Sequence, residues 1–167
     1  LIIFLSDNGG NREGEMFGYQ GHKANPANYD SWAKVGGRSS SYGQGWANVS
    51  NTPFRRYKRE NHEGGISAPF IVHWPAGGVK PGLTHQVAHL IDLMPTFAEL
   101  AGATYPTARA GQKVPPAEGL SLVPVLHGTL LGERTLFWEH EGNRAVREGD
   151  WKLVAQSGKP WELYDMT

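Results

Sequence analysis

Two neighbouring side chains near the start of the sequence, Asp7 and Asn8, carry oxygen atoms of the kind that hard divalent cations bind. They follow the apolar run of residues 1–5, whose β-branched and aromatic members predict a buried strand of a parallel sheet. Parallel strands deliver their carboxyl ends to the crevice in which α/β proteins bind ligands. Taken alone, Asn8 and Gly9 are better explained as a turn. The position of Asp7 and Asn8 at the end of a strand favours a different interpretation, in which they supply two of the ligands of a Ca²⁺ or Mg²⁺ site.

Four cationic side chains occur within the five positions 55–59, and Lys58 is the lysine among them. Such a run is usually a solvated basic loop. It can also form an anion site, in which a lysine contacts sulfate or phosphate while the Glu-Gly-Gly of residues 63–65 fixes the turn that aims it. Residue types alone leave both interpretations open.

The histidines offer weaker candidates for chemistry. His85 and His89 are four residues apart, but they precede a helix start and need not be helical, so we expect packing rather than metal ligation. His62 and His140 are each suited either to reaching a substrate cleft or to bracing a turn. None of the four is expected to be catalytic.

Hydrophobic patterning predicts the elements that position these residues. Residues 70–74 form a second short apolar run, which we expect to lie beside the first strand. Between the strands, residues 11–59 lack periodicity and are rich in Gly, Ser and Asn. A connection of that length predicts a functional loop or lid.

Prolines mark the starts of two helices further along the chain. Asp92 is a suitable N-cap, Pro95 falls in the first turn and Gly102 stands where a C-terminal glycine belongs. Residues 121–128 repeat this order of cap, proline and glycine in a shorter helix.

The C-terminal quarter predicts a small antiparallel sheet. Its short strands cover residues 136–140, 145–147, 151–154 and 161–164. The Glu-Gly-Asp of residues 148–150 is a hairpin signal. The predicted fold class is α/β, divided into a main part at 1–128 and an antiparallel-sheet subdomain at 129–167, which we expect to be truncated.

Composition excludes several classes of partner. Sixteen basic residues balance sixteen acidic ones, so no long-range field recruits nucleic acid or an anionic membrane. No apolar stretch approaches the roughly 20 residues of a membrane helix. The absence of cysteine excludes disulfides and thiolate metal sites within these residues. Both ends of the chain are expected to be cut through structure.

Several segments in order resemble the signatures of the type I sulfatases, or arylsulfatases, of the alkaline phosphatase superfamily. The matching segments are Ser6-Asp7-Asn8-Gly9, Lys58 with Glu63-Gly64-Gly65-Ile66, Pro69 to Pro75, Ile91 to Thr96, Leu100-Ala101-Gly102, and Trp151-Lys152-Leu153 with Glu162 to Asp165. The order and spacing resemble the C-terminal half of that family. The resemblance implies the C-terminal part of an alkaline-phosphatase-like sandwich.

The resemblance implies roles for three residues. Asp7 and Asn8 would bind the active-site Ca²⁺, in preference to Mg²⁺, and Lys58, five residues before Glu63, would contact the sulfate group. The family's nucleophile is a formylglycine made from a Cys/Ser-x-Pro-x-Arg motif, which does not occur here. We therefore expect this chain alone to be inactive. Ser67 stands where the family often has Arg, which leaves substrate preference open.

The implied activity is hydrolysis of a small-molecule or carbohydrate sulfate ester, and the resemblance implies a periplasmic or secreted location. A phosphodiesterase or phosphonate monoester hydrolase of the same superfamily is the nearest alternative, because a metal and a lysine also suit phosphoryl transfer. A non-catalytic carbohydrate-binding module is the alternative from another class, supported by the aromatic, Gly-rich loop and six Trp. Neither nucleic-acid nor membrane partners are expected, and the sequence indicates no oligomeric state.

Overall fold

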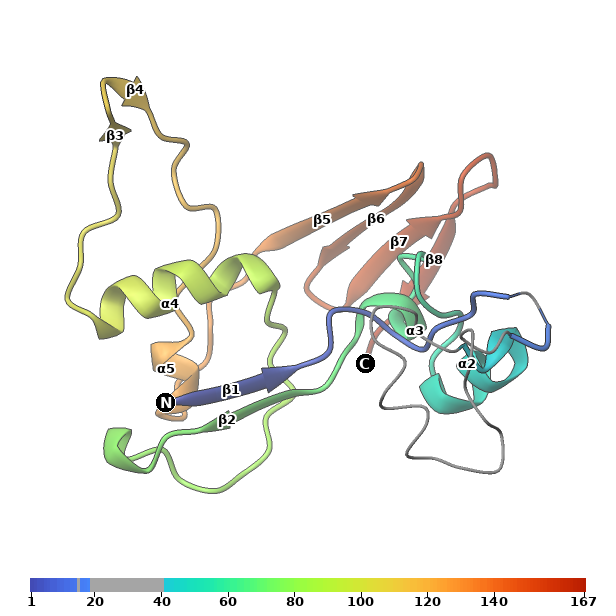
Figure 1. Cartoon of the computed structure of the whole chain (residues 1–167), viewed down its shortest axis with the longest axis horizontal. Helices are drawn as coiled ribbons and strands as arrows, with labels where there is room; N and C mark the ends of the chain where they lie inside the picture. The colour runs from blue at the N-terminus through green and yellow to red at the C-terminus, as the bar shows by residue number, and fades with distance from the viewer. Residues whose placement is uncertain (15, 19–40) are drawn as a thin grey trace, which may run out of the picture. The chain divides into compact units, whose positions relative to one another are not determined.

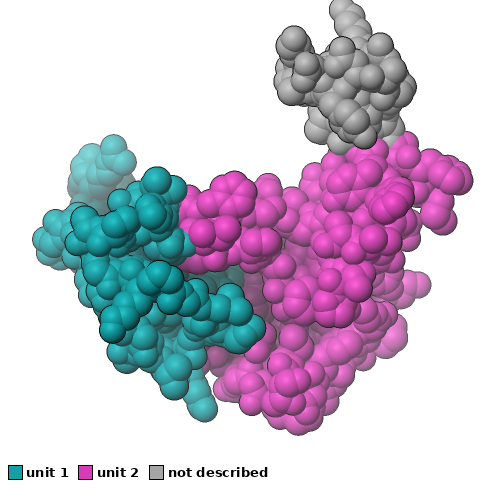
Figure 2. Space-filling view, turned by 90° about the horizontal axis from the view of Figure 1, so that it is seen from below, with its two compact units in different colours: residues 1–2, 72–133 teal, residues 3–71, 134–167 magenta. Residues whose placement is uncertain are grey.

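The computed structural model describes residues 1–14, 16–18 and 41–167. The chain divides into two compact units, coloured separately in Figure 2. Unit 1 comprises residues 1–2 and 72–133, and unit 2 comprises residues 3–71 and 134–167. The C-terminal strands therefore share a compact unit with the segment that carries Lys58. The functional division into 1–128 and 129–167 stays a prediction.

Helices and strands are mixed along the first part of the chain, and the last four elements are all strands (Figure 1). In order they are β1 (Ile2–Leu5), α2 (Gly43–Asn51), α3 (Glu63–Ile66), β2 (Phe70–His73), the 3-10 turns η1 (Pro75–Gly77) and η2 (Leu90–Asp92), α4 (Leu93–Leu100), β3 (Ala108–Arg109), β4 (Gln112–Lys113), α5 (Val123–Leu126), β5 (Thr135–His140), β6 (Asn143–Glu148), β7 (Trp151–Ala155) and β8 (Glu162–Asp165). Within the described ranges, no helix has the length and apolar character needed to cross a bilayer.

Strands β1 and β2 pair with each other, as predicted. Figure 1 shows β2 running back along β1, so these two strands are antiparallel to each other, a direction that the apolar pattern had not indicated. The reason lies at the end of β1, where the Gly9 amide donates to the Gly65 carbonyl at 2.9 Å just before β2 begins. Burial on both faces was also expected, yet Ile2 and Phe4 are exposed.

Helix α2 corrects the expectation that residues 11–59 form one loop without secondary structure. Residues 15 and 19–40 of that segment lie outside the described residues, whereas Gly43–Asn51 is helical. Ala47 is fully buried and anchors the helix in unit 2. This helix has no recognisable helical pattern of apolar residues, because its sequence is mostly polar and contains glycines at positions 43 and 45.

Unit 1 confirms both predicted proline-started helices. Asp92 occupies the N-cap position of α4, although its buried carboxylate accepts hydrogen bonds from the amides of His89 at 2.7 Å and Leu120 at 2.9 Å instead of capping α4 itself. Gly102 and Gly128 follow α4 and α5 with left-handed φ values of 62° and 83°. His89 is a structural residue, because its ring accepts from the backbone two residues on.

The C-terminal sheet has the predicted antiparallel meander, in the order β5-β6-β7-β8. In strand β7, the face that carries a lysine is the buried one. Lys152 and Val154 are buried, while Trp151 and Leu153 on the other face are exposed. This register carries a lysine into the interior of unit 2.

Candidate site at the end of strand β1

Local hydrogen bonds shape the loop that follows β1. Ser6 Oγ donates to the Asn8 carbonyl at 2.8 Å, and Asn8 Nδ2 donates to the Gly9 carbonyl at 3.0 Å. The second bond fixes the orientation of the Asn8 amide. Asp7 is exposed and Asn8 half-buried. The two predicted oxygen donors therefore sit on an ordered and accessible turn.

Three glycines, Gly9, Gly64 and Gly65, interlock this turn with α3. The Gly9 amide donates to the Gly65 carbonyl at 2.9 Å. A Cβ on Gly9 would lie 1.7 Å from the Gly64 carbonyl oxygen, and a Cβ on Gly65 would lie 2.0 Å from that of Glu60. Close backbone approach, not positive φ, requires these glycines. We call Gly9, Gly64 and Gly65 the glycine interlock.

Lys58 contacts the same loop from the other side. Its backbone amide donates to the Gly10 carbonyl at 3.1 Å, and its Nζ lies 2.7 Å from Glu13 Oε1. The two side chains of this ion pair are 34% and 39% exposed, so an incoming anion can reach Lys58. The structure thus places Lys58 beside the turn that carries Asp7 and Asn8. Sequence reasoning missed Glu13, for which the only signal was closeness in sequence to Asp7.

The cations of the basic run separate in space. Their side-chain partners all differ: Arg55 contacts Glu162, Arg56 contacts Gln156, Lys58 contacts Glu13 and Arg59 contacts Glu141. Among these four, and within the described residues, Lys58 is the one whose side chain pairs with the loop after β1. The run is therefore not a single basic patch, and Lys58 is its candidate anion ligand.

The donor set fits one half of a hard-cation site. Asp7 and Asn8 supply carboxylate and amide oxygens, and Ca²⁺ takes about six to eight oxygen ligands. In the part of the chain that the structure describes, no group of three His, Cys, Asp or Glu side chains could hold a metal ion. The chemistry of the two residues suits Ca²⁺, and further donors are needed to complete a site.

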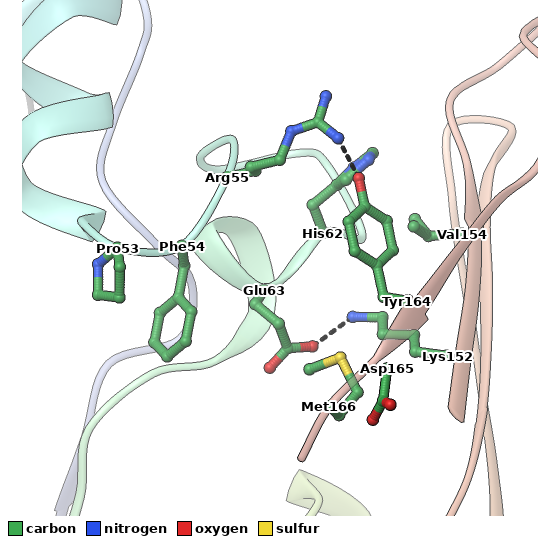
Figure 3. Close-up of a pocket in the computed structure, with 10 residues that line it drawn as sticks. All are labelled: Pro53, Phe54, Arg55, His62, Glu63, Lys152, Val154, Tyr164, Asp165 and Met166. Atoms are coloured by element: carbon green, nitrogen blue, oxygen red, sulfur yellow. Dashed lines mark hydrogen bonds and ion pairs between the residues drawn. The ribbon is translucent and has the colours of Figure 1, made fainter. Parts of the chain in front are cut away.

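A cleft of about 300 Å³ in unit 2 lies next to α3 (Figure 3). Its walls are Pro53, Phe54, Arg55, His62, Glu63, Lys152, Val154, Tyr164, Asp165 and Met166. Two ionic contacts join its sides: Lys152 to Glu63, and Arg55 to the Glu162–Tyr164 pair. A hydrogen bond from Tyr164 and the cation of Arg55 hold the pKa of Glu162 below its usual range. Glu162 therefore stays ionised beside Arg55.

Comparison with known proteins now decides the family. The model of the family described as Sulfatase matches residues 1–103. The chain belongs to the sulfatase family.

Several sulfatases are similar to this chain in sequence. An uncharacterized sulfatase of Schizosaccharomyces pombe is 32% identical over the whole chain, which spans 32% of that relative. Arylsulfatase of Klebsiella aerogenes is 34% identical over 73% of this chain and 27% of its own length. Bovine arylsulfatase A is 39% identical over 57% of this chain and 18% of its own. The chain thus spans about a third or less of these relatives.

A solved structure supports the fold of this sulfatase-family chain. The crystal structure of Ps i-CgsB superposes with a TM-score of 0.59 and 22% identity, and the match covers 98% of this chain and 29% of that one. The α/β, alkaline-phosphatase-like fold predicted from the sequence is confirmed.

His62 of this sulfatase-family chain is buried directly before α3. Its side chain is 2% exposed, with Nε2 3.6 Å from the Glu162 carboxylate and its ring edge-on to Tyr164 at 6.2 Å. Burial lowers the pKa of His62, against the opposing attraction of Glu162. The neutral ring is therefore favoured in the folded state. His140, by contrast, is 58% exposed.

The lowered pKa of His62 predicts acid sensitivity. The unfolded chain binds a proton on this histidine near pH 6.5, whereas the folded state resists protonation, so the stabilisation is complete above that pH. It is lost as the pH falls from 6.5 through the folded-state pKa. We expect His62→Phe to flatten the dependence of unfolding free energy on pH between 5 and 7.5. The matched variant His140→Gln should keep that dependence, and equal flattening by both would contradict the assignment.

Proposed function

We propose that this chain is the C-terminal portion of the catalytic domain of a sulfuric ester hydrolase. Asp7 and Asn8 would supply two ligands to a Ca²⁺ ion, and Lys58 would bind the sulfate group. The observation that carries the proposal is the hydrogen bond from the Lys58 amide to the Gly10 carbonyl. It holds the lysine against the turn that bears both oxygen donors.

The residues of the chain fit these roles chemically. Lys58 would exchange its contact with Glu13 for one with a sulfate oxygen, where its charge stabilises the negative charge that develops during transfer. The bound cation would supply charge neutralisation and polarisation of an S–O bond. Neither Lys58 nor Asp7 is a nucleophile in this scheme. We propose that a formylglycine in the preceding part of the protein performs the attack.

The substrate class is proposed from the relatives of this chain. Relatives are named for activity toward aryl sulfates, choline sulfate and N-acetylgalactosamine 6-sulfate, and Ps i-CgsB has been crystallised with a carrageenan oligosaccharide. We propose a small-molecule or carbohydrate sulfate ester as substrate. A periplasmic or secreted location accompanies this proposal, and nucleic acid or membrane is not proposed as a partner.

The test compares matched esters with Ca²⁺ present. We expect the full-length protein to hydrolyse 4-nitrophenyl sulfate faster than 4-nitrophenyl phosphate or bis(4-nitrophenyl) phosphate, and the 167-residue chain alone to hydrolyse none of them. Faster phosphate or phosphodiester turnover would favour the phosphohydrolase alternative. Turnover by the chain alone would show that the nucleophile lies within it, and a wholly inactive full-length protein that binds sulfated sugars would favour the binding module.

A further inference from the structure

Lys152 is a buried cation tied to the candidate site across the chain. It lies in the interior face of β7 with 1% of its side chain exposed, and its Nζ is 2.5 Å from Glu63 Oε1 (Figure 3). The two residues are separated by 89 positions in sequence. The Trp138 ring covers the ammonium group at 5.4 Å. No role described so far uses this lysine.

The burial of Lys152 makes the pair a geometric restraint. Removing an ammonium group from water costs several kcal/mol, which is recovered only when the partner is held in good geometry. Burial lowers the pKa of Lys152 and the charge of Glu63 offsets only part of that shift, so the ammonium group depends on Glu63 to stay charged in the interior. Glu63 therefore cannot move away from β7 without leaving a buried charge unpaired.

Further hydrogen bonds attach the C-terminal sheet to the residues before Glu63. Asn61 Nδ2 donates to the Asn143 carbonyl at 2.9 Å, and Asn143 Nδ2 donates to the Arg59 carbonyl at 3.0 Å. Gln156 Nε2 donates to Glu60 Oε1 at 3.0 Å. The C-terminal sheet thus holds the segment from residue 59 to residue 63 through hydrogen bonds. Along this segment, the Lys152–Glu63 ion pair is the contact that directly precedes Gly64 and Gly65 of the glycine interlock.

The interlock carries this restraint to the site. Glu63 is the first residue of α3, and Gly64 and Gly65 follow it directly. Gly65 accepts the hydrogen bond from Gly9, and a Cβ on Gly9 would lie 1.7 Å from the Gly64 carbonyl oxygen. A shift of α3 therefore moves the turn that bears Asp7 relative to Lys58.

We propose that Lys152 is a positioning residue of the site, whose ion pair with Glu63 aligns Asp7 and Asn8 with Lys58. The inference rests on the proposed function, since it gives the C-terminal sheet a part in sulfate ester hydrolysis. Lys152 itself touches neither substrate nor metal in this scheme. Its effect reaches the site through Glu63 and the glycine interlock.

The first test uses the full-length protein and an aryl sulfate. Lys152→Met keeps the approximate length of the side chain and removes its charge. We expect this variant to lower kcat by about 10-fold while KM changes by less than about twofold, because alignment of the site matters most in the transition state. The matched control is Lys159→Met, which removes an exposed lysine from the turn after β7. It should leave both constants unchanged.

A double variant separates positioning from stability. Lys152→Met leaves the half-buried Glu63 carboxylate without its cation and should destabilise the fold. Adding Glu63→Leu removes that unpaired charge and should restore the melting temperature. If Lys152 positions the site, kcat stays low in the restored double variant. A kcat within about twofold of the unmodified protein in either folded variant would overturn the proposal.

Hydrogen exchange tests the restraint independently of any activity. In Lys152→Met we expect the Gly9 and Gly65 amides to lose protection, while the amides of the β5–β6 hairpin keep theirs. Unchanged protection at Gly9 and Gly65 would overturn the positioning role. If the unmodified full-length protein fails to hydrolyse sulfate esters but Gly9 loses protection in the variant, the proposed function is wrong and the restraint stands.

Discussion

Replacing Lys58 with Met should lower kcat/KM of the full-length protein toward an aryl sulfate by about 10²–10³-fold. The variant removes the cation beside the Asp7–Asn8 turn, and with it the charge that would face the transferring group in the proposed site. Folding should survive, because the Lys58–Glu13 pair is about one-third exposed and such pairs contribute little stability. Steady-state kinetics on a purified, folded variant gives the measurement.

Arg59→Gln is the matched control, since it removes the neighbouring cation, whose partner Glu141 lies on the surface. We expect kcat/KM to stay within about threefold of the unmodified protein, as for other exposed ion pairs. Similar losses in both variants would mean that the run acts through its total charge. A Lys58 variant with near-normal kcat/KM would remove this residue from the proposed site.

Gly9→Ala should destabilise the protein by about 3 kcal/mol or more, or prevent folding. The added Cβ would lie 1.7 Å from the Gly64 carbonyl oxygen and 3.2 Å from the Gly65 Cα. Both neighbours are backbone atoms, which cannot rotate away as a side chain can. Relief requires separating the turn from α3 and breaking the Gly9–Gly65 hydrogen bond. Chemical denaturation of the full-length protein measures the loss.

Gly45→Ala is the same chemical change, but we expect it to raise the stability of the protein. Gly45 lies within α2, and among the described residues beyond its chain neighbours and its own helix backbone no atom lies within 4 Å of the Cβ that alanine would add. Alanine should therefore stabilise the protein by about 0.5–1 kcal/mol through its higher helix propensity. Comparable stability of the Gly9 and Gly45 variants would contradict the close packing of the interlock.

Local chemistry made much of the fold predictable. Gly102 and Gly128 end their helices because only a residue that tolerates positive φ satisfies those carbonyl groups cheaply. Gly149 turns the hairpin between β6 and β7 for a related reason. Each of these signals depends on a few adjacent residues. Asp7 and Lys58 were singled out by the family resemblance, and the structure places the Lys58 amide against Gly10, in the loop that follows Asp7.

Long-range features were not predictable in the same way. The alternation in β7 suggested no buried lysine, because Trp151 and Leu153 are the more apolar face, yet Lys152 is the residue turned inward. Its partner Glu63 lies 89 positions away, and no local rule links them. The direction of β2 against β1 also depends on the distant contact between Gly9 and Gly65.

The distance between these partners has a kinetic consequence. Contacts between residues far apart in sequence form late, because the entropy of closing the intervening loop is lost before the contact contributes any stabilisation. The β5–β8 meander closes through short hairpins and can form early. We expect the Lys152–Glu63 pair and the glycine interlock to form after this meander. The site at the end of β1 should therefore be among the last parts of unit 2 to assemble.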